Sequence, residues 1–295
     1  MEQPYELGGR FTLGPRSVHR VGFGAMQLAG DGVFGPPRDR NEALRVLRAA
    51  AAAGVDHIDT AQFYGAGTVN ELIREALHPY PDGLAIVSKV AVPADDRSAP
   101  RGYDGPDRMR AGIEANLVAL GTDRLAAVNL RLPDPSDLPG ERFDAQLAAL
   151  IRCREEGLIE GVGLSNVSRR HLLRAVDQTE IVCVQNLFNL ADQRCTDVLD
   201  ACTERGIAFV PFCPLGWPGE IRRHLLTDPV LTVEAARLDA TPAQAALAWL
   251  FGLAPNILLI PGTRTRGHLA ENLASAAFSL DAAGRTALAR RFPAP

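Results

Sequence analysis

The stretch Val55-Asp-His-Ile-Asp-Thr-Ala-Gln-Phe-Tyr-Gly65 has the pattern of a buried strand that ends in a polar turn. Side chains alternate between the two faces of a strand, so this strand delivers the Asp59 carboxylate at its carboxyl end. Tyr64 follows five residues later, and a second apolar run at 84–89 ends in Lys89. These three groups either form a proton-transfer site or are an ordinary ion pair beside a surface tyrosine.

Outward from this stretch, the chain repeats one unit: a helix, a glycine stop, an apolar strand and a polar loop. Thr241 with Gln244 marks one helix start as a capping box, and Gly121 marks one helix end. A short hairpin at 11–21 precedes the first unit. The expected strands lie at 21–26, 55–59, 84–89, 125–131, 158–164, 181–185, 207–212 and 256–260.

Eight such units in 295 residues predict an α/β fold, namely a single (β/α)8 TIM barrel with a short N-terminal β-hairpin that spans 1–295 as one domain. A doubly wound parallel sheet is the alternative. The pair Gly22 and Gly24 begins a Gly-x-Gly pattern, but Gln27 stands at the third glycine position. The residues that follow open a helix poorly, so we reject a Rossmann dinucleotide loop.

Composition argues against several classes of protein. The formal net charge is −4, from 31 basic and 35 acidic residues, which gives no reason to expect nucleic-acid or membrane partners. Five cysteines without a Cys-x-x-Cys pair predict reduced thiols, and the N-terminus lacks a signal pattern, so we expect a cytoplasmic protein. His57 and Asp59 match barrel metal sites weakly, and we expect no metal.

In a (β/α)8 barrel the chemistry lies at the carboxyl ends of the strands. There Lys89 would lower the pKa of the Tyr64 phenol from its usual value near ~10, and Asp59 would hold the lysine in place. Arg131, at the end of another strand, would stabilise negative charge on a reacting oxygen. The groups Asp59, Tyr64, Lys89 and Arg131 together suit the reduction of a carbonyl, with Tyr64 as general acid and a hydride arriving from elsewhere.

Several motifs in order along residues 21–272 make the chain resemble the aldo/keto reductase superfamily. They are 54–65, Ser88-Lys89, Gly163-Leu-Ser-Asn166, Val184-Gln-Asn186 and Pro214-Leu-Gly216. The resemblance implies a (β/α)8 barrel that reduces aldehydes and ketones with NADPH. It implies Tyr64 as the acid, Lys89 as its tuner and Asp59 as the lysine's partner.

The resemblance also implies a cofactor site. Ser165, Asn166 and Gln185 would bind the nicotinamide carboxamide, and Phe212 would stack on the ring in place of the usual tyrosine. Our full set of cofactor residues is Met26, Gln27, Ser165, Asn166, Gln185, Phe212, Pro214, Leu215, Gly216, Gly262, Thr263, Arg264, His268, Glu271 and Asn272.

Two departures from the family pattern bear on the cofactor and the substrate. In the family a lysine and an arginine usually hold the 2′-phosphate of NADPH; here Gly262 stands in place of the lysine, and His268 stands in place of the arginine. Arg264 and Arg266 either supply the missing positive charge or are solvated loop charges. We favour NADP(H) and keep NAD(H) as an alternative. Arg131 replaces the usual histidine and either faces an anionic substrate group or pairs with a nearby aspartate, Asp134 or Asp137.

The substrate is expected to contact Tyr64, Arg131 and Trp217, with loops at 91–105 and 132–140 completing the pocket; Trp217 as plain packing is the alternative. Further motifs, such as Val-Asn-Leu-Arg131, resemble a bacterial subgroup that includes pyridoxal reductases. The sequence therefore predicts an NADPH-dependent carbonyl reductase of a small-molecule substrate, with pyridoxal as the leading candidate. The alternatives are a ketone reductase of a sugar or natural-product pathway and a slow-turnover regulatory subunit that binds the cofactor.

Overall fold

The computed structural model describes residues 5–91 and 105–294. Within them, seven parallel strands pair in chain order to form one curled sheet. The segment 256–260 closes the ring, because Ile257 bridges to Phe209 on one side and Leu259 bridges to Val21 on the other. The strands are β3 (Phe23–Gly24), β4 (His57–Asp59), β5 (Ala85–Val90), β6 (Ala127–Arg131), β7 (Val162–Ser165), β8 (Ile181–Leu187) and β9 (Ala208–Phe212).

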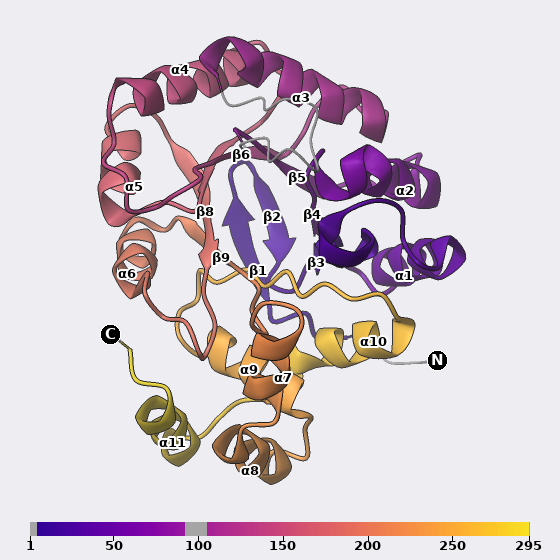
Figure 1. The fold of residues 1–295 in the computed structure, drawn as a ribbon, viewed down its shortest axis with the longest axis vertical. Helices are drawn as coiled ribbons and strands as arrows, with labels where there is room; N and C mark the ends of the chain where they lie inside the picture. The colour runs from indigo at the N-terminus through magenta and orange to yellow at the C-terminus, as the bar shows by residue number, and fades with distance from the viewer. Residues whose placement is uncertain (1–4, 92–104, 295) are drawn as a thin grey trace.

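Helices surround this ring on its outer side (Figure 1). The α-helices are α1 (Arg40–Ala52), α2 (Thr68–Leu77), α3 (Pro106–Leu120), α4 (Glu141–Glu155), α5 (Arg169–Val176), α6 (Thr196–Arg205), α7 (Glu220–Leu226), α8 (Pro229–Arg237), α9 (Pro242–Phe251), α10 (Arg266–Ala274) and α11 (Ala282–Arg291). The predicted (β/α)8 barrel is confirmed. None of the helices in the described part of the chain is long and apolar enough to cross a bilayer.

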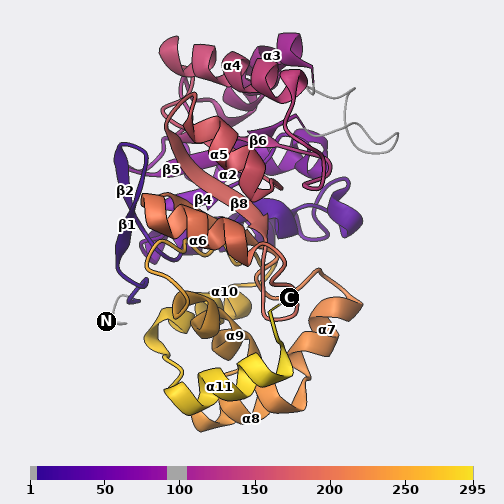
Figure 2. The same ribbon diagram turned by 90° about the vertical axis from the view of Figure 1, so that its left-hand side faces the viewer.

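The predicted N-terminal hairpin is present and covers one end of the barrel. Its strands are β1 (Arg10–Leu13) and β2 (Arg16–His19). Leu13 and Val18 are fully buried and pack against inward-facing residues of the sheet such as Ala85 and Ala208. Figure 2 shows the hairpin on the side of the molecule opposite α7. The site must therefore lie at the other end of the barrel, where the strands have their carboxyl termini.

Two predicted strands differ in the structure, and two helices were not predicted. The strand expected at 21–26 is reduced to β3, because the chain turns into the 3₁₀ helix η1 (Ala25–Leu28) directly after Gly24. The strand expected at 158–164 begins only at Val162, since 158–161 contribute a single bridge to the neighbouring strand. Helices α7 and α8 were not predicted, although Asp228 caps α8 and Pro229 occupies its first turn.

Candidate active site

Asp59 and Lys89 form a buried ion pair at the carboxyl ends of two neighbouring strands. The parallel register places Asp59 beside Val87, so Lys89 stands two residues further along β5 and reaches back across. Its Nζ atom donates to Asp59 Oδ1 at 2.6 Å and to the Thr60 carbonyl at 2.9 Å. Both side chains are almost fully buried, which strengthens their attraction.

Tyr64 lies directly beside this pair, at the start of the 3₁₀ turn η3 (Tyr64–Gly67). Lys89 Nζ is 5.0 Å from the centroid of the tyrosine ring, which is only 5% exposed. Burial raises the pKa of the phenol, and the charge of Lys89 opposes this without overcoming it. The expected net lowering of the Tyr64 pKa is therefore wrong for the free protein, because desolvation outweighs the lysine. The phenol keeps its proton at neutral pH.

Lys89 remains charged in spite of its burial. Desolvation alone would lower the pKa of its ammonium group, but the negative charge of Asp59, with a smaller contribution from Tyr64, outweighs desolvation, and the pKa is raised. Lys89, held in place by Asp59, therefore presents its ammonium group to Tyr64, and the carboxylate of Asp59 offsets part of that charge. A positive charge at this position would stabilise the phenolate left after proton donation.

Arg131 ends β6 on the same side of the barrel. Its Nη1 donates to Ser165 Oγ at 3.1 Å, and its guanidinium carbon lies 5.1 Å from the centroid of the Phe212 ring. Among the described residues no carboxylate forms an ion pair with it, so the alternative of a partner in Asp134 or Asp137 finds no support. Its positive charge is left uncompensated at the mouth of the barrel.

These groups line one cavity of about 460 Å³, which we call the catalytic cavity. Trp217 contributes an exposed aromatic wall, and Phe34 and Phe63 add two further rings that the sequence did not suggest. Of the loops expected to complete the pocket, 132–140 contributes Leu132 and Pro133, whereas 92–104 lie outside the described residues. The predicted residues in this cavity are Met26, Gln27, Asp59, Tyr64, Lys89, Arg131, Gln185, Phe212, Pro214, Trp217 and Gly262.

A second cavity of about 510 Å³ continues from the first. The two share Gln27, Arg222 and Gly262, so together they form one elongated cleft. An elongated cleft with two lobes suits a dinucleotide, with one ring system in each lobe. The predicted cofactor residues in the second cavity are Gln27, Leu215, Gly262, Thr263, Arg264, His268, Glu271 and Asn272.

Two buried polar atoms along this cleft lack a protein partner. Gln185 donates through Nε2 to Asp59 Oδ2 at 2.7 Å, which leaves its Oε1 atom without a hydrogen bond. Arg222 lies where the cavities meet, and its buried Nε atom has no partner either. Burial lowers the pKa of Arg222, so an anion beside it would relieve an unfavourable state. These two atoms fit the carboxamide and the pyrophosphate of a nicotinamide dinucleotide.

Arg222 is the main residue that sequence analysis missed. It belongs to α7, a short helix between β9 and α8 that the hydrophobic pattern did not reveal. No carboxylate of the described residues pairs with it. A single arginine in a polar segment that predicts a surface turn does not by itself indicate a binding site in a sequence.

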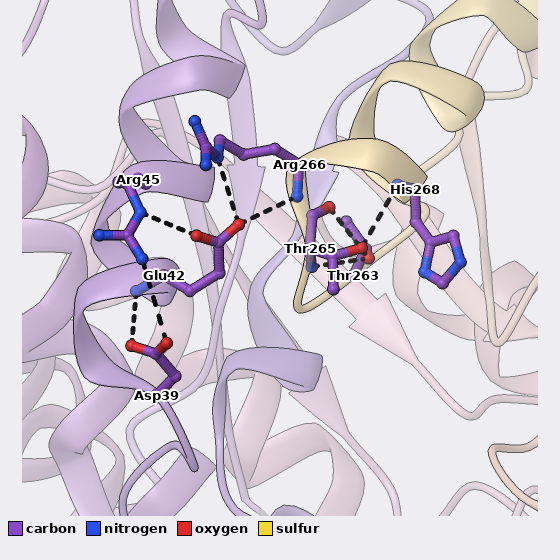
Figure 3. Close-up of polar contacts among 7 residues, drawn as sticks. All are labelled: Asp39, Glu42, Arg45, Thr263, Thr265, Arg266 and His268. Carbon is purple, nitrogen blue, oxygen red and sulfur yellow. Dashed lines mark hydrogen bonds and ion pairs between the residues drawn. The ribbon is translucent and has the colours of Figure 1, made fainter.

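Arg264 and Arg266 both have partners, so neither is a simple solvated loop charge. Arg264 donates to the Gln27 carbonyl at 2.8 Å and pairs with Asp31 at 3.2 Å. Arg266 donates through its backbone N and Nε to Glu42 of α1, each at 3.3 Å (Figure 3). In the same view Thr265 caps α10 by accepting from the His268 backbone at 3.3 Å.

Three predicted cofactor residues, Ser165, Asn166 and Gly216, line neither cavity. Ser165 accepts the hydrogen bond of Arg131, and Asn166 donates to the Leu132 carbonyl at 2.9 Å. The structure therefore places Gln185 at the cleft but leaves these three beside it.

Gly262 has a steric explanation. A Cβ added there would lie 2.4 Å from the Gly24 carbonyl oxygen and 3.2 Å from Gln27 Cγ. The backbone of β3 approaches 260–262 so closely that a lysine, the usual family residue, would collide with it. In this structure a side chain at position 262 would force the two segments apart, so the glycine fits their close approach.

The sequence profile of the aldo/keto reductase family matches residues 20–288. The chain belongs to the aldo/keto reductase family. Pyridoxine 4-dehydrogenase of Escherichia coli K12 is 46% identical over 267 residues, which are 90% of this chain and 92% of that protein. An uncharacterized oxidoreductase of Schizosaccharomyces pombe is 33% identical over 272 residues, 92% of this chain and 86% of that one.

Solved structures agree with this assignment. A thermostable aldo-keto reductase in complex with the inhibitor epalrestat superposes with a TM-score of 0.79 at 29% identity, over 95% of this chain and 98% of that chain. The aldo-keto reductase of Klebsiella pneumoniae in complex with NADPH gives a TM-score of 0.79 at 25% identity, over 98% of this chain and 96% of the other. The family membership and the barrel expected from the motifs are both confirmed.

Proposed function

We propose that this protein reduces the aldehyde of pyridoxal, or of a closely similar anionic aromatic aldehyde, with NADPH as the hydride donor. The observation that carries the proposal is the uncompensated charge of Arg131 in the same cavity as Tyr64 and Lys89. The similarity to a pyridoxine 4-dehydrogenase and to a reductase solved with NADPH supports both the substrate and the cofactor.

The reaction needs a hydride and a proton. Bound NADPH supplies the hydride to the carbonyl carbon. Tyr64 gives its phenolic proton to the carbonyl oxygen, so the aldehyde becomes a primary alcohol and the tyrosine a phenolate. Lys89, held at 2.6 Å by Asp59, stabilises that phenolate until a proton returns from solvent.

Arg131 gives the site its preference for an anion. Pyridoxal carries a phenolate oxygen next to its aldehyde, and a guanidinium group binds such an oxygen through a charge-assisted hydrogen bond. The aromatic rings of Phe212, Phe34 and Trp217 line the same cavity and suit a flat heteroaromatic substrate.

The cofactor would extend along the cleft through both cavities. Gln185 Oε1 would accept from the nicotinamide carboxamide, Phe212 would face the ring and Arg222 would bind the pyrophosphate. We assign the adenosine with its 2′-phosphate to the second cavity, near Thr263, Arg264 and His268 at the N-terminal turn of α10. A helix N-terminus favours a negative charge there.

A comparison of two aldehydes tests this proposal. Purified protein is supplied with NADPH and either pyridoxal or 4-pyridinecarboxaldehyde, which keeps the pyridine ring and the aldehyde but lacks the phenolate and the two neutral substituents, the methyl and hydroxymethyl groups. We expect faster NADPH oxidation with pyridoxal, through a lower KM. Equal kcat/KM for the two aldehydes would reject the role of the anion, and no turnover of either would reject pyridoxal-type aldehydes as substrates.

A further inference from the structure

A buried polar network lies behind the catalytic strands, outside both cavities. Asn70 of α2 and Asn116 of α3 are its centre, and both are at most 1% exposed. Asn70 Nδ2 donates to Asn116 Oδ1 at 2.9 Å, which joins the two helices. Figure 1 shows α2 and α3 as neighbours outside β4 and β5.

The network holds the residues adjacent to the catalytic pair. Thr60, which follows Asp59, donates its hydroxyl to Asn70 Oδ1 at 2.7 Å. Ser88, which precedes Lys89, donates its hydroxyl to Asn116 Oδ1 at 2.6 Å. Because side chains alternate along a strand, Thr60 and Ser88 face the helices while their neighbours face the cavity.

Thr60 is also a direct partner of the lysine. Its backbone carbonyl accepts from Lys89 Nζ at 2.9 Å, although β4 itself ends one residue earlier. Past the strand, one backbone hydrogen bond ties Thr60 to Val87, at 2.9 Å. The Asn70 side chain supplies the second restraint on this residue.

The same asparagine restrains the turn that carries the tyrosine. Asn70 Nδ2 also donates to Gln62 Oε1 at 2.7 Å, and Gln62 stands two residues before Tyr64. One buried side chain thus bonds both Thr60 and Gln62, the first and the middle residue of the segment 60–64. A loose segment would move the Thr60 carbonyl and the Tyr64 ring relative to Lys89, and a displacement near 1 Å can cost about 100-fold in rate.

We propose that Asn70 is a positioning residue that, together with Asn116, locks the segment 60–64 and the end of β5 in the geometry needed for proton donation. The proposal rests on the role of Tyr64 as general acid. It does not depend on pyridoxal as the substrate, so any aldehyde that the wild-type protein reduces can serve in the test.

The experiment compares two threonine-to-valine variants. Thr60→Val removes the hydroxyl that bonds Asn70 Oδ1 at 2.7 Å. Thr203→Val removes a similar hydroxyl that bonds Asn256 Oδ1 at 2.9 Å, and neither Thr203 nor Asn256 lines the two cavities. We expect Thr60→Val to lower kcat about tenfold and to shift the alkaline limb of its pH profile, with the Kd of NADPH unchanged. Thr203→Val should change Tm alone.

A double variant tests whether Thr60 and Asn70 act through the same hydrogen bond. If Thr60 acts through Asn70, the Asn70→Ala and Thr60→Val changes together should lower kcat no further than Asn70→Ala alone. Should Asn70→Ala fail to fold, Ser88→Ala replaces it, because its hydroxyl reaches the same network through Asn116. Full additivity of the Asn70 and Thr60 changes, or a Thr60→Val variant with the kcat and pH profile of Thr203→Val, would overturn the proposal.

A crystal structure of Thr60→Val gives a readout that needs no turnover. The contact between Lys89 Nζ and the Thr60 carbonyl, 2.9 Å here, should lengthen or be lost. An unchanged contact would contradict the proposal. Failure of the wild-type protein to reduce pyridoxal, by contrast, would affect only the proposed substrate.

Discussion

Replacement of Arg131 by glutamine should lower kcat/KM for anionic aldehydes and leave kcat/KM for neutral aldehydes unchanged. The change removes the charge that faces the catalytic cavity and keeps a side chain that can still bond Ser165. A hydrogen bond to a charged group contributes about 1.5–3 kcal/mol, and the partial exposure of Arg131 reduces this to about 1–2 kcal/mol. At 1.4 kcal/mol per factor of ten, kcat/KM for pyridoxal should fall roughly 5- to 30-fold.

The assay follows NADPH oxidation by the wild type and by Arg131→Gln with pyridoxal and with 4-pyridinecarboxaldehyde. Only the value for pyridoxal should fall, because the second aldehyde has no anion for the guanidinium group to bind. Arg222→Gln serves as a matched control, since it removes a cationic side chain from the same cavity at the proposed pyrophosphate position. The Arg222→Gln change should lower kcat/KM for the two aldehydes by the same factor. An equal loss on both aldehydes in Arg131→Gln, or no loss, would refute the reasoning.

Three further outcomes follow from the same geometry. Arg222→Gln should raise the Kd of NADPH and of NADH by a similar factor, about tenfold, because both carry the pyrophosphate; an effect on NADPH alone would place Arg222 at the 2′-phosphate. Gly262→Ala should lower the free energy of unfolding by about 1–3 kcal/mol, because its Cβ would lie 2.4 Å from the Gly24 oxygen; unchanged denaturant midpoints would contradict this. Burial raises the pKa to about 12 for the Cys183 thiol, to about 12 for Cys195 and to about 11 for Cys213, so little thiolate exists at neutral pH. Iodoacetamide should therefore label these thiols only at alkaline pH or after denaturation. Rapid labelling at neutral pH would contradict this expectation and show that the sites open.

The sequence predicted that Asp59, Tyr64 and Lys89 lie together, because their placement depends on local rules. The period of two along a strand places Asp59 and Lys89 inside the barrel, and both lie near the carboxyl ends of their strands, where the active sites of this fold are found. The family motifs then indicated the role that we propose for Tyr64. These features require only short-range patterns, which a single sequence displays well.

Other features depend on contacts between distant segments, which a single sequence does not display. The direction of the Tyr64 pKa results from burial by the whole barrel, which outweighs the one charge that the sequence suggested. Arg222 reaches the cleft from a helix of only seven residues, and the close approach of Gly262 to β3 leaves no room for a side chain without a shift of the backbone. The partners of Arg264 lie more than 200 positions away along the chain.

The most direct test of the central claim is the rate of hydride transfer in a single turnover of Tyr64→Phe. This variant keeps the ring beside Lys89 and removes only the proton donor. With NADPH and pyridoxal, or another aldehyde that the wild type reduces, the rate should fall about 100-fold or more while the Kd of NADPH stays the same. A Tyr64→Phe variant that transfers hydride at the wild-type rate would contradict the role of Tyr64 as the acid.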